Sequence, residues 1–129
     1  MRVRISWQGG QVILKLRDTL IARRMAHTLP IQSKVQTWGD EIYFKFPVQA
    51  ENDPDSTDVV DPGTVCYWVE GKSIAIPFGP TPIAENGECR LANKVTILGE
   101  MEEDPRTLEA LNSDDSIRIQ LLGRPTWSR

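Results

Sequence analysis

The sequence lacks the segments that would carry a chain into or across a membrane. No apolar run approaches the roughly 20 residues that span a bilayer, and the opening MRVRISW has no apolar core of a signal peptide. We therefore expect a cytoplasmic protein that makes no membrane contact. The 129 residues, of which 40% are hydrophobic and 26% charged, are enough to bury a core. Length and composition predict a single domain over residues 1–129.

An excess of basic residues is also missing. Lys and Arg number 15 against 18 Asp and Glu, which gives a formal net charge of -3. Proteins that bind nucleic acid normally present a basic stripe, so we expect no nucleic-acid partner. Cysteine is scarce, because Cys66 and Cys89 are the only two, with no close spacing and no neighbouring histidine. Cytosolic proteins rarely form disulfides, so buried, reduced thiols are predicted.

The common signatures of catalysis and metal binding are absent as well. The sequence contains no Gly-x-Ser-x-Gly, P-loop or dinucleotide fingerprint. His27 is the single histidine and has no Cys near it, which argues against a zinc site. The predicted helix face that carries His27 points to solvent, which argues against a Ser-His-Asp site. Asp53, Asp55, Asp58 and Asp61 lack the Gly and the terminal Glu of an EF-hand, so we interpret them as a solvated loop. We expect no metal and no cofactor.

Short strands dominate the segments that remain. Period-2 alternation of apolar residues predicts strands at 2–7, 12–17, 41–46, 64–69, 73–78, 91–101 and 116–123. Asp18 or Thr19 can cap a helix that ends near Leu29, and Asp104-Pro105 starts a second, short helix. The acidic stretch AENDPDSTD predicts a loop, and Pro77 predicts an edge or a bulge in its strand. Seven or eight short strands with two helices indicate an all-β fold, a closed antiparallel barrel with helical caps.

One strand, within TWGDEIYFKFPV, has two contrasting faces. Ile42, Phe44 and Phe46 alternate with Glu41, Tyr43 and Lys45, so we expect the first set in the core and the second outside. The outer set is open to two interpretations. It is a solvated surface, or it is one wall of a groove roofed by the loop from Gly79 to Glu88.

In the groove interpretation, Tyr43 and either Tyr67 or Trp68 offer apolar bodies with polar tips. Glu41 and Arg90 would orient a ligand. Seven of the nine aromatic residues lie between positions 38 and 78, close to this strand in the sequence. Aromatic walls with a few polar groups are typical of ligand pockets.

Three stretches together resemble the small prokaryotic cyclophilin-like proteins that are often called atypical cyclophilins. They are TWGDEIYFKFPV, VVDPGTVCYWVEGKSIAIPFGPTP and NKVTILGEM, and the resemblance covers nearly the whole chain. Two positions depart from the family pattern, Val69 where the family usually has Pro and Pro77 where it usually has Phe. The resemblance implies a cyclophilin-type barrel of eight strands closed by two helices. It leaves function open, because isomerase activity in this family is inferred from the fold.

Prolyl isomerisation must overcome a barrier of about 18–20 kcal/mol that comes from amide resonance. The cyclophilin resemblance implies an arginine on a strand after the first helix, yet no arginine occurs between Met25 and Cys89. Lys45 lacks the planar fork of a guanidinium, and SIAIPF contains no glutamine. Arg90 is the one candidate for a relocated arginine. The usual isomerase residues are therefore missing.

Three hypotheses about function follow. The first is a module that binds a peptide segment or a small metabolite in a groove on the barrel. The second is an atypical isomerase without the usual arginine, and the third is an accessory subunit of an enzyme complex, with a protein partner or a homodimer left open. The candidate ligand-binding residues are Trp38, Glu41, Tyr43, Tyr67, Trp68, Thr81 and Arg90.

Overall fold

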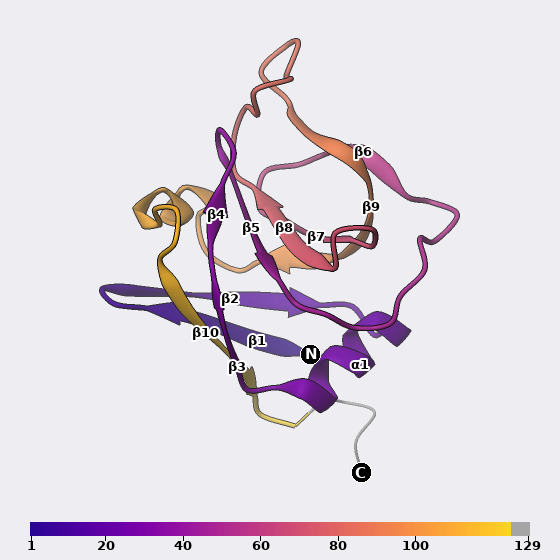
Figure 1. Ribbon diagram of the computed structural model, residues 1–129, viewed down its shortest axis with the longest axis vertical. Coiled ribbons are helices and arrows are strands. Elements are labelled where there is room, and N and C mark those ends of the chain that lie inside the picture. The colour runs from indigo at the N-terminus through magenta and orange to yellow at the C-terminus, as the bar shows by residue number, and fades with distance from the viewer. Residues whose placement is uncertain (125–129) are drawn as a thin grey trace.

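The computed structural model describes residues 1–124, and one long sheet organises them (Figure 1). Its strands follow the order β3-β10-β1-β2-β9-β7-β8-β5-β4, and every pairing is antiparallel. The strands on this path are β1 (Arg2–Trp7), β2 (Gly10–Leu16), β3 (Ile31–Lys34), β4 (Gln36–Thr37), β5 (Glu41–Lys45), β7 (Thr64–Trp68), β8 (Ser73–Pro77), β9 (Cys89–Met101) and β10 (Ser116–Leu122).

The two ends of this path meet. Only Val35 separates β3 from β4, so one nearly continuous segment pairs first with β10 and then with β5. Across the remaining gap, the Ser33 hydroxyl donates a hydrogen bond to the carbonyl oxygen of Lys45 at 3.0 Å. With β3 and β4 taken as one, the described residues form a nearly closed barrel of eight strands. The predicted barrel is confirmed.

Phenylalanines fill the barrel interior, as the alternation in TWGDEIYFKFPV predicted. Ile42, Phe44 and Phe46 are each at most 1% exposed and belong to the main apolar cluster. Tyr67 joins them at 1% exposure. Its neighbours in the chain, Cys66 and Trp68, therefore point to the other side of β7.

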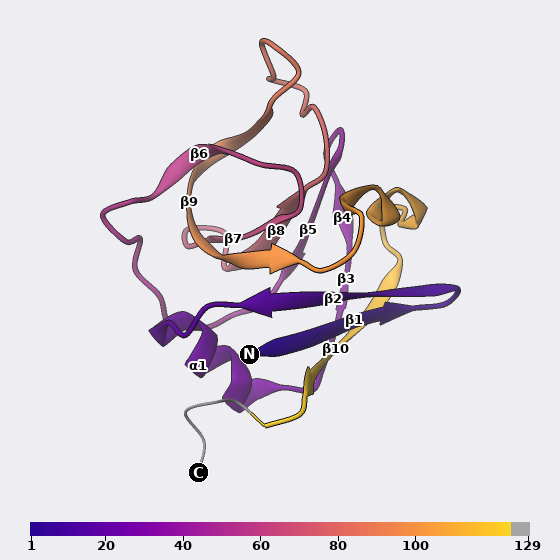
Figure 2. The same ribbon diagram turned by 180° about the vertical axis from the view of Figure 1, so that it is seen from behind.

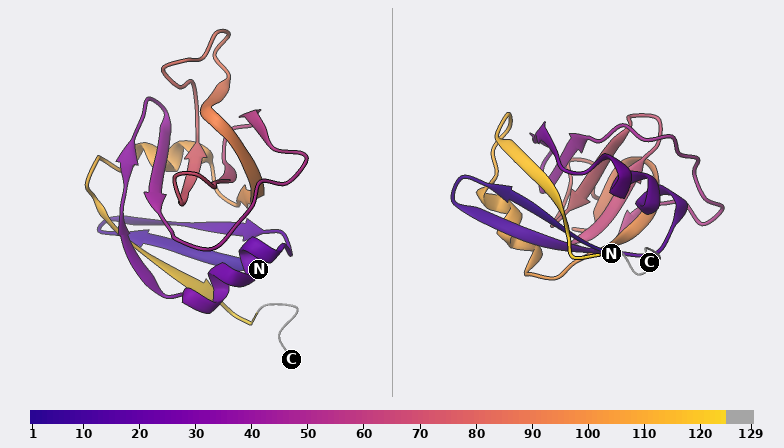
Figure 3. Two further views of the ribbon diagram at one scale, coloured as in Figure 1. Left: turned by 45° about the vertical axis from the view of Figure 1, so that its right-hand side comes forward. Right: turned by 90° about the horizontal axis from the view of Figure 1, so that it is seen from below.

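The two helices pack at different places on the barrel (Figure 3). Helix α1 (Leu20–Thr28) starts at Thr19, whose side chain accepts a hydrogen bond from Ala22 N–H, and it buries Ile21, Ala22 and Met25. The short 3₁₀ helix η1 (Pro105–Ala110) starts at Asp104 and buries Leu108. His27 is exposed, as expected. No helix within residues 1–124 has the length and apolar character needed to cross a bilayer.

Three strands were not predicted from the sequence. β3 and β4 are short and polar, so their pattern lacks an apolar alternation. β6 (Thr57–Val60) begins inside the stretch assigned to a loop, and it pairs with β9 beside the main sheet. The loop assignment is therefore wrong for Thr57 and Asp58. Trp127, predicted in a C-terminal tail, lies outside the described residues.

The expectation that Pro77 marks a sheet edge or a bulge is also wrong, since the registers of β8 with β5 and β7 are regular. β8 lies between β5 and β7 and pairs with both. Pro77 is tolerated there because it is the last residue of the strand, where the ladder can continue without its missing N–H. Its carbonyl oxygen accepts a hydrogen bond from Gly63 N–H at 2.8 Å, and the next residue, Phe78, donates to Asp40 at 2.7 Å.

One strand reaches beyond the barrel wall. β9 pairs with β2 and β7 through its second half, whereas its first half pairs with β6 from Cys89 to Val95. Figure 2 shows β9 as a long arc, with β6 beside the part that leaves the barrel. Gly99 lets the backbone of β9 approach β2 closely. A Cβ at this position would lie 2.0 Å from the carbonyl oxygen of Lys15 on β2. The arc brings the first half of β9 over the outside of the sheet.

Candidate functional site

The outer face of β5, β8 and β7 forms the floor of the site. In the strand register Tyr43 and Cys66 both pair with Ala75, so these three lie side by side across the sheet. Glu41 lies on the same face towards one end of the strands and Trp68 towards the other. Ala75 is small and lies between larger neighbours. The floor is therefore hollow at its centre.

The first half of β9 covers this floor. Leu91 and Val95 are 4% and 1% exposed, and they form a second apolar cluster with Cys66 and Ala75 outside the barrel. Tyr43, Val60 and Trp68 pack against that cluster. The loop from Gly79 to Glu88 was expected to be the roof, and this expectation is wrong, because none of its residues borders the cavity described next.

A pocket of about 260 Å³ remains between floor and cover. Four residues singled out in the sequence border it, two from β5, one from the turn before it and one from β7. The lining consists of Trp38, Glu41, Tyr43, Trp68, Ala75, Leu91, Ala92, Asn93 and Val95. Glu41 is the single charged side chain in this set. The pocket lining is therefore mainly aromatic and apolar, with one acid, Glu41, and one amide, Asn93.

Two buried polar atoms in the lining residues have no hydrogen-bond partner within residues 1–124. They are Oε1 of Glu41 and Nε1 of Trp68. Glu41 is only 6% exposed, so the solvated-surface interpretation is wrong for this residue. Burial raises the pKa of its carboxyl group to about 7, because the charged form is poorly solvated there. Glu41 can therefore change its charge close to neutral pH.

The Thr-Trp-Gly motif forms the tight turn that places Trp38 and Glu41. Trp38 N–H donates to the carbonyl oxygen of Glu41 at 2.9 Å, and Asp40 N–H donates to that of Pro80 at 3.1 Å. Gly39 has a φ of +59°, and a Cβ there would lie 2.6 Å from Cδ of Pro82. Two motifs that are 40 residues apart in the chain thus pack against each other. The loop from Gly79 supports the pocket from outside.

The Tyr-Trp motif places Trp68 at the other end of the pocket. A Cβ on Gly71 would lie 2.1 Å from the indole ring of Trp68, so the ring rests directly on this glycine. The carbonyl oxygen of Gly71 accepts hydrogen bonds from Lys45 Nζ at 2.7 Å and from the Ser73 hydroxyl at 2.8 Å. These contacts fix the turn on which the indole lies. The packing of the indole therefore requires a glycine at position 71, the third residue of the turn between β7 and β8.

Three of the predicted site residues lie elsewhere. Tyr67 belongs to the barrel core, where its hydroxyl donates to the carbonyl oxygen of Phe46 at 2.8 Å. Thr81 is 5% exposed, and its hydroxyl donates to the carbonyl oxygen of Arg90. Arg90 does not border the pocket. The structure thus brings together Trp38, Glu41, Tyr43 and Trp68 but separates them from the other three.

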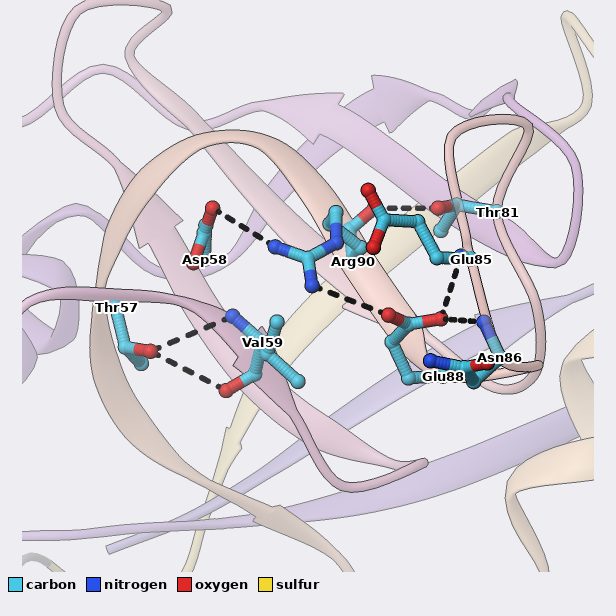
Figure 4. A network of polar contacts seen from close by, with 8 residues as sticks. All are labelled: Thr57, Asp58, Val59, Thr81, Glu85, Asn86, Glu88 and Arg90. Atoms are coloured by element: carbon cyan, nitrogen blue, oxygen red, sulfur yellow. Dashed lines mark hydrogen bonds and ion pairs between the residues drawn. The ribbon is translucent and has the colours of Figure 1, made fainter.

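Arg90 belongs to a polar network beside β6 (Figure 4). Its guanidinium lies 3.4 Å from a carboxylate oxygen of Asp58 and 3.1 Å from one of Glu88. Glu88 also accepts hydrogen bonds from the backbone N–H groups of Glu85 and Asn86, each at 2.8 Å. The bond from Asn86 is the largest of several causes that lower the pKa of Glu88 to about 2. This network ties the loop to β9 and β6.

Several residues of the pocket were missed from the sequence. Ala75 has a recognisable signal, a small residue on the outer face of SIAIP beside a row of large ones. Leu91 and Val95 had the right spacing for a buried face, but nothing local showed that β9 would curve over the sheet. Cys66 and Cys89 are buried and free, as predicted, and burial raises the pKa of the Cys66 thiol.

Comparison with known proteins agrees with this architecture. The sequence profile described as Cyclophilin-like matches residues 1–120. The solution structure of the hypothetical protein AF2241 from Archaeoglobus fulgidus is similar, with a TM-score of 0.78 and 34% sequence identity over 93% of each chain. No curated protein matches the chain. The chain therefore belongs to the cyclophilin-like family.

Proposed function

We propose that this protein binds a small molecule, or one side chain of a peptide segment, in the pocket between β5, β7, β8 and the first half of β9. The pocket has the composition of a ligand site, with aromatic walls and very few polar groups. Its volume of about 260 Å³ suits a compact ligand rather than a large cofactor. Trp38 and Trp68 stand at its borders, and Glu41 supplies one ionisable group.

One observation carries the proposal. Oε1 of Glu41 and Nε1 of Trp68 are both buried with no hydrogen-bond partner among residues 1–124, and both residues line the same pocket. Buried polar groups are nearly always hydrogen-bonded, since an unpartnered one costs about 1–3 kcal/mol. A ligand that supplies partners would remove this penalty. Such groups are expected at functional sites rather than in a core selected for stability alone.

The test is a fragment screen by thermal shift on three forms of the protein. The wild type is compared with Ala75→Leu, which fills the hollow in the floor, and with Ala110→Leu, which adds the same side chain at an exposed position on η1. Fragments should stabilise the wild type and Ala110→Leu but not Ala75→Leu. Equal stabilisation of all three forms would place binding outside this pocket.

Isomerase activity has weaker support. Arg90, the candidate for a relocated arginine, is engaged by Asp58 and Glu88, and the pocket lining contains no cation that could donate to a proline nitrogen. We therefore expect no acceleration of a proline-limited refolding reaction. A rate that rises with protein concentration would restore the isomerase hypothesis, and its loss in Arg90→Lys would locate the active group.

A further inference from the structure

We propose that the ligand of this pocket carries a protonated amine on a small apolar body, and that the amine pairs with the Glu41 carboxylate. This inference rests on the proposed function and adds the chemical class of the ligand. It follows from the charge of the lining, from the unpartnered oxygen of Glu41 and from the aromatic residues around it.

The charge of the lining selects against anions. Glu41 is the single charged side chain that borders the pocket, and no Lys, Arg or His in residues 1–124 joins it there. An anionic ligand would meet a like charge in a poorly solvated space and find no cation to pair with. A cationic or neutral ligand is compatible with this lining.

The buried oxygen of Glu41 favours a strong donor. A carboxylate that is 6% exposed is unfavourable unless it is paired and hydrogen-bonded, and its Oε1 has neither kind of partner in the described chain. An ammonium group supplies both the charge and the N–H donor. Pairing with a cation then holds Glu41 in its ionised form.

Two buried thiols lie near Glu41. They belong to Cys66 on β7 and Cys89 on β9, and both feel the charge of the Glu41 carboxylate. Burial raises the pKa of both thiols, so they stay protonated at neutral pH. A change in affinity around pH 7 can therefore be assigned to Glu41.

The aromatic residues complete the match to an organic cation. Trp38, Tyr43 and Trp68 supply three aromatic rings to the lining. The faces of such rings attract ammonium groups, most strongly where water is excluded. Between the two ends of the pocket, Ala75, Leu91 and Val95 offer an apolar surface for the body of the ligand.

The experiment uses three probes of nearly equal shape, benzylamine, benzyl alcohol and benzoate, titrated into the full chain by NMR. At pH 8 we expect benzylamine to bind at least tenfold more tightly than benzyl alcohol, and benzoate not to bind. Below pH 7 the affinity for benzylamine should fall by up to tenfold per pH unit, because Glu41 must be ionised to pair with it. The affinity for benzyl alcohol should not fall in this way.

Two variants distinguish a specific pairing of the amine with Glu41 from a general attraction of cations to an acidic protein. Glu41→Gln should bind benzylamine and benzyl alcohol equally and lose the pH dependence, whereas Glu51→Gln, an exposed acid outside the pocket, should behave as the wild type. The second arm of the experiment uses lysine amide acetylated on its α-nitrogen, so that the side-chain amine stays free. Tighter binding of this compound than of benzylamine would identify a peptide side chain as the source of the amine, and the reverse would indicate a free amine.

The outcomes distinguish the two proposals. Benzyl alcohol could bind at least as well as benzylamine and shift the indole N–H signals of Trp38 and Trp68. The proposal of an amine ligand is then wrong, while the proposal that the pocket binds a ligand is kept. The same holds if Glu41→Gln keeps the preference for benzylamine. If none of the probes shifts either signal, the assignment of the ligand class fails. If the fragment screen is also negative, the proposed function fails with it.

Discussion

The interior of the barrel and the pocket on its outside are made from the same strands. They differ in how completely their buried polar groups are hydrogen-bonded. Inside, Phe44 and Phe46 are at most 1% exposed, and the buried hydroxyl of Tyr67 has its hydrogen bond to Phe46. Outside, the second apolar cluster is small, and Glu41 and Trp68 have buried polar atoms without hydrogen-bond partners in the described part of the chain. The interior is built for stability. The pocket keeps unsatisfied polar groups, a departure from full hydrogen bonding that is consistent with the proposed binding site.

The largest contrast should appear between two adjacent residues of β5. Phe44→Ala removes a fully buried ring from the barrel and should destabilise the protein by about 3–5 kcal/mol. Tyr43→Ala, on the opposite face, should cost less than half as much, because Tyr43 is only half-buried. Urea unfolding of both variants measures the two values. Similar losses would mean that the two faces contribute equally to stability.

A second contrast concerns pH. The pKa of Glu41 is about 7 in the folded chain, above the ordinary 4.5, so the folded state holds the proton more tightly than the unfolded state. The stability that this group contributes is fully present below pH 4.5, declines between pH 4.5 and 7, and stays low above pH 7. A rise in pKa of this size corresponds to a change of about 3 kcal/mol in the free energy of unfolding.

Glu41→Gln should therefore match the wild type at about pH 4, below the unfolded pKa, and exceed it at pH 8, by up to about 3 kcal/mol in the free energy of unfolding. Urea unfolding at several pH values checks this, with Glu51→Gln as the exposed control. A difference between Glu41→Gln and the wild type that does not change with pH would show that the carboxyl group is not the titrating residue.

A smaller contrast separates the two tyrosines. Tyr67→Phe removes the donor to the buried carbonyl oxygen of Phe46 and should cost about 1–2 kcal/mol. Tyr43→Phe should change stability by less than about 0.5 kcal/mol, because the phenol borders a pocket that water can enter. Thermal unfolding of both variants at one pH gives the comparison. Equal effects would place the Tyr43 hydroxyl in a buried hydrogen bond.

The sequence predicted the barrel better than the pocket. Alternation alone separated Phe44 and Phe46 from Glu41 and Tyr43, since a strand places successive side chains on opposite faces. Alternation failed for β3 and β6, two four-residue segments that are strands only because a neighbouring strand supplies hydrogen bonds. The local sequence pattern gives no information about that neighbouring strand.

The site shows the same limit. Trp38, Glu41, Tyr43 and Trp68 were proposed together from one aromatic-rich region, and the structure places them in the lining of one pocket. Tyr67 could not be separated from Trp68 without the register of β7. The pocket that Glu41 borders is covered by β9, a strand that pairs with β6, β7 and β2. Such long-range pairing is not readable from any single segment.

The four tryptophans offer the most direct test that the outer pocket is the binding site. Each indole N–H gives its own signal in a ¹⁵N–¹H spectrum, and Trp38 and Trp68 line the pocket whereas Trp7 belongs to β1. Titration with the fragments that stabilise the protein should shift the signals of Trp38 and Trp68 and leave that of Trp7 in place. Shifts at Trp7 without shifts at Trp38 and Trp68 would contradict the account.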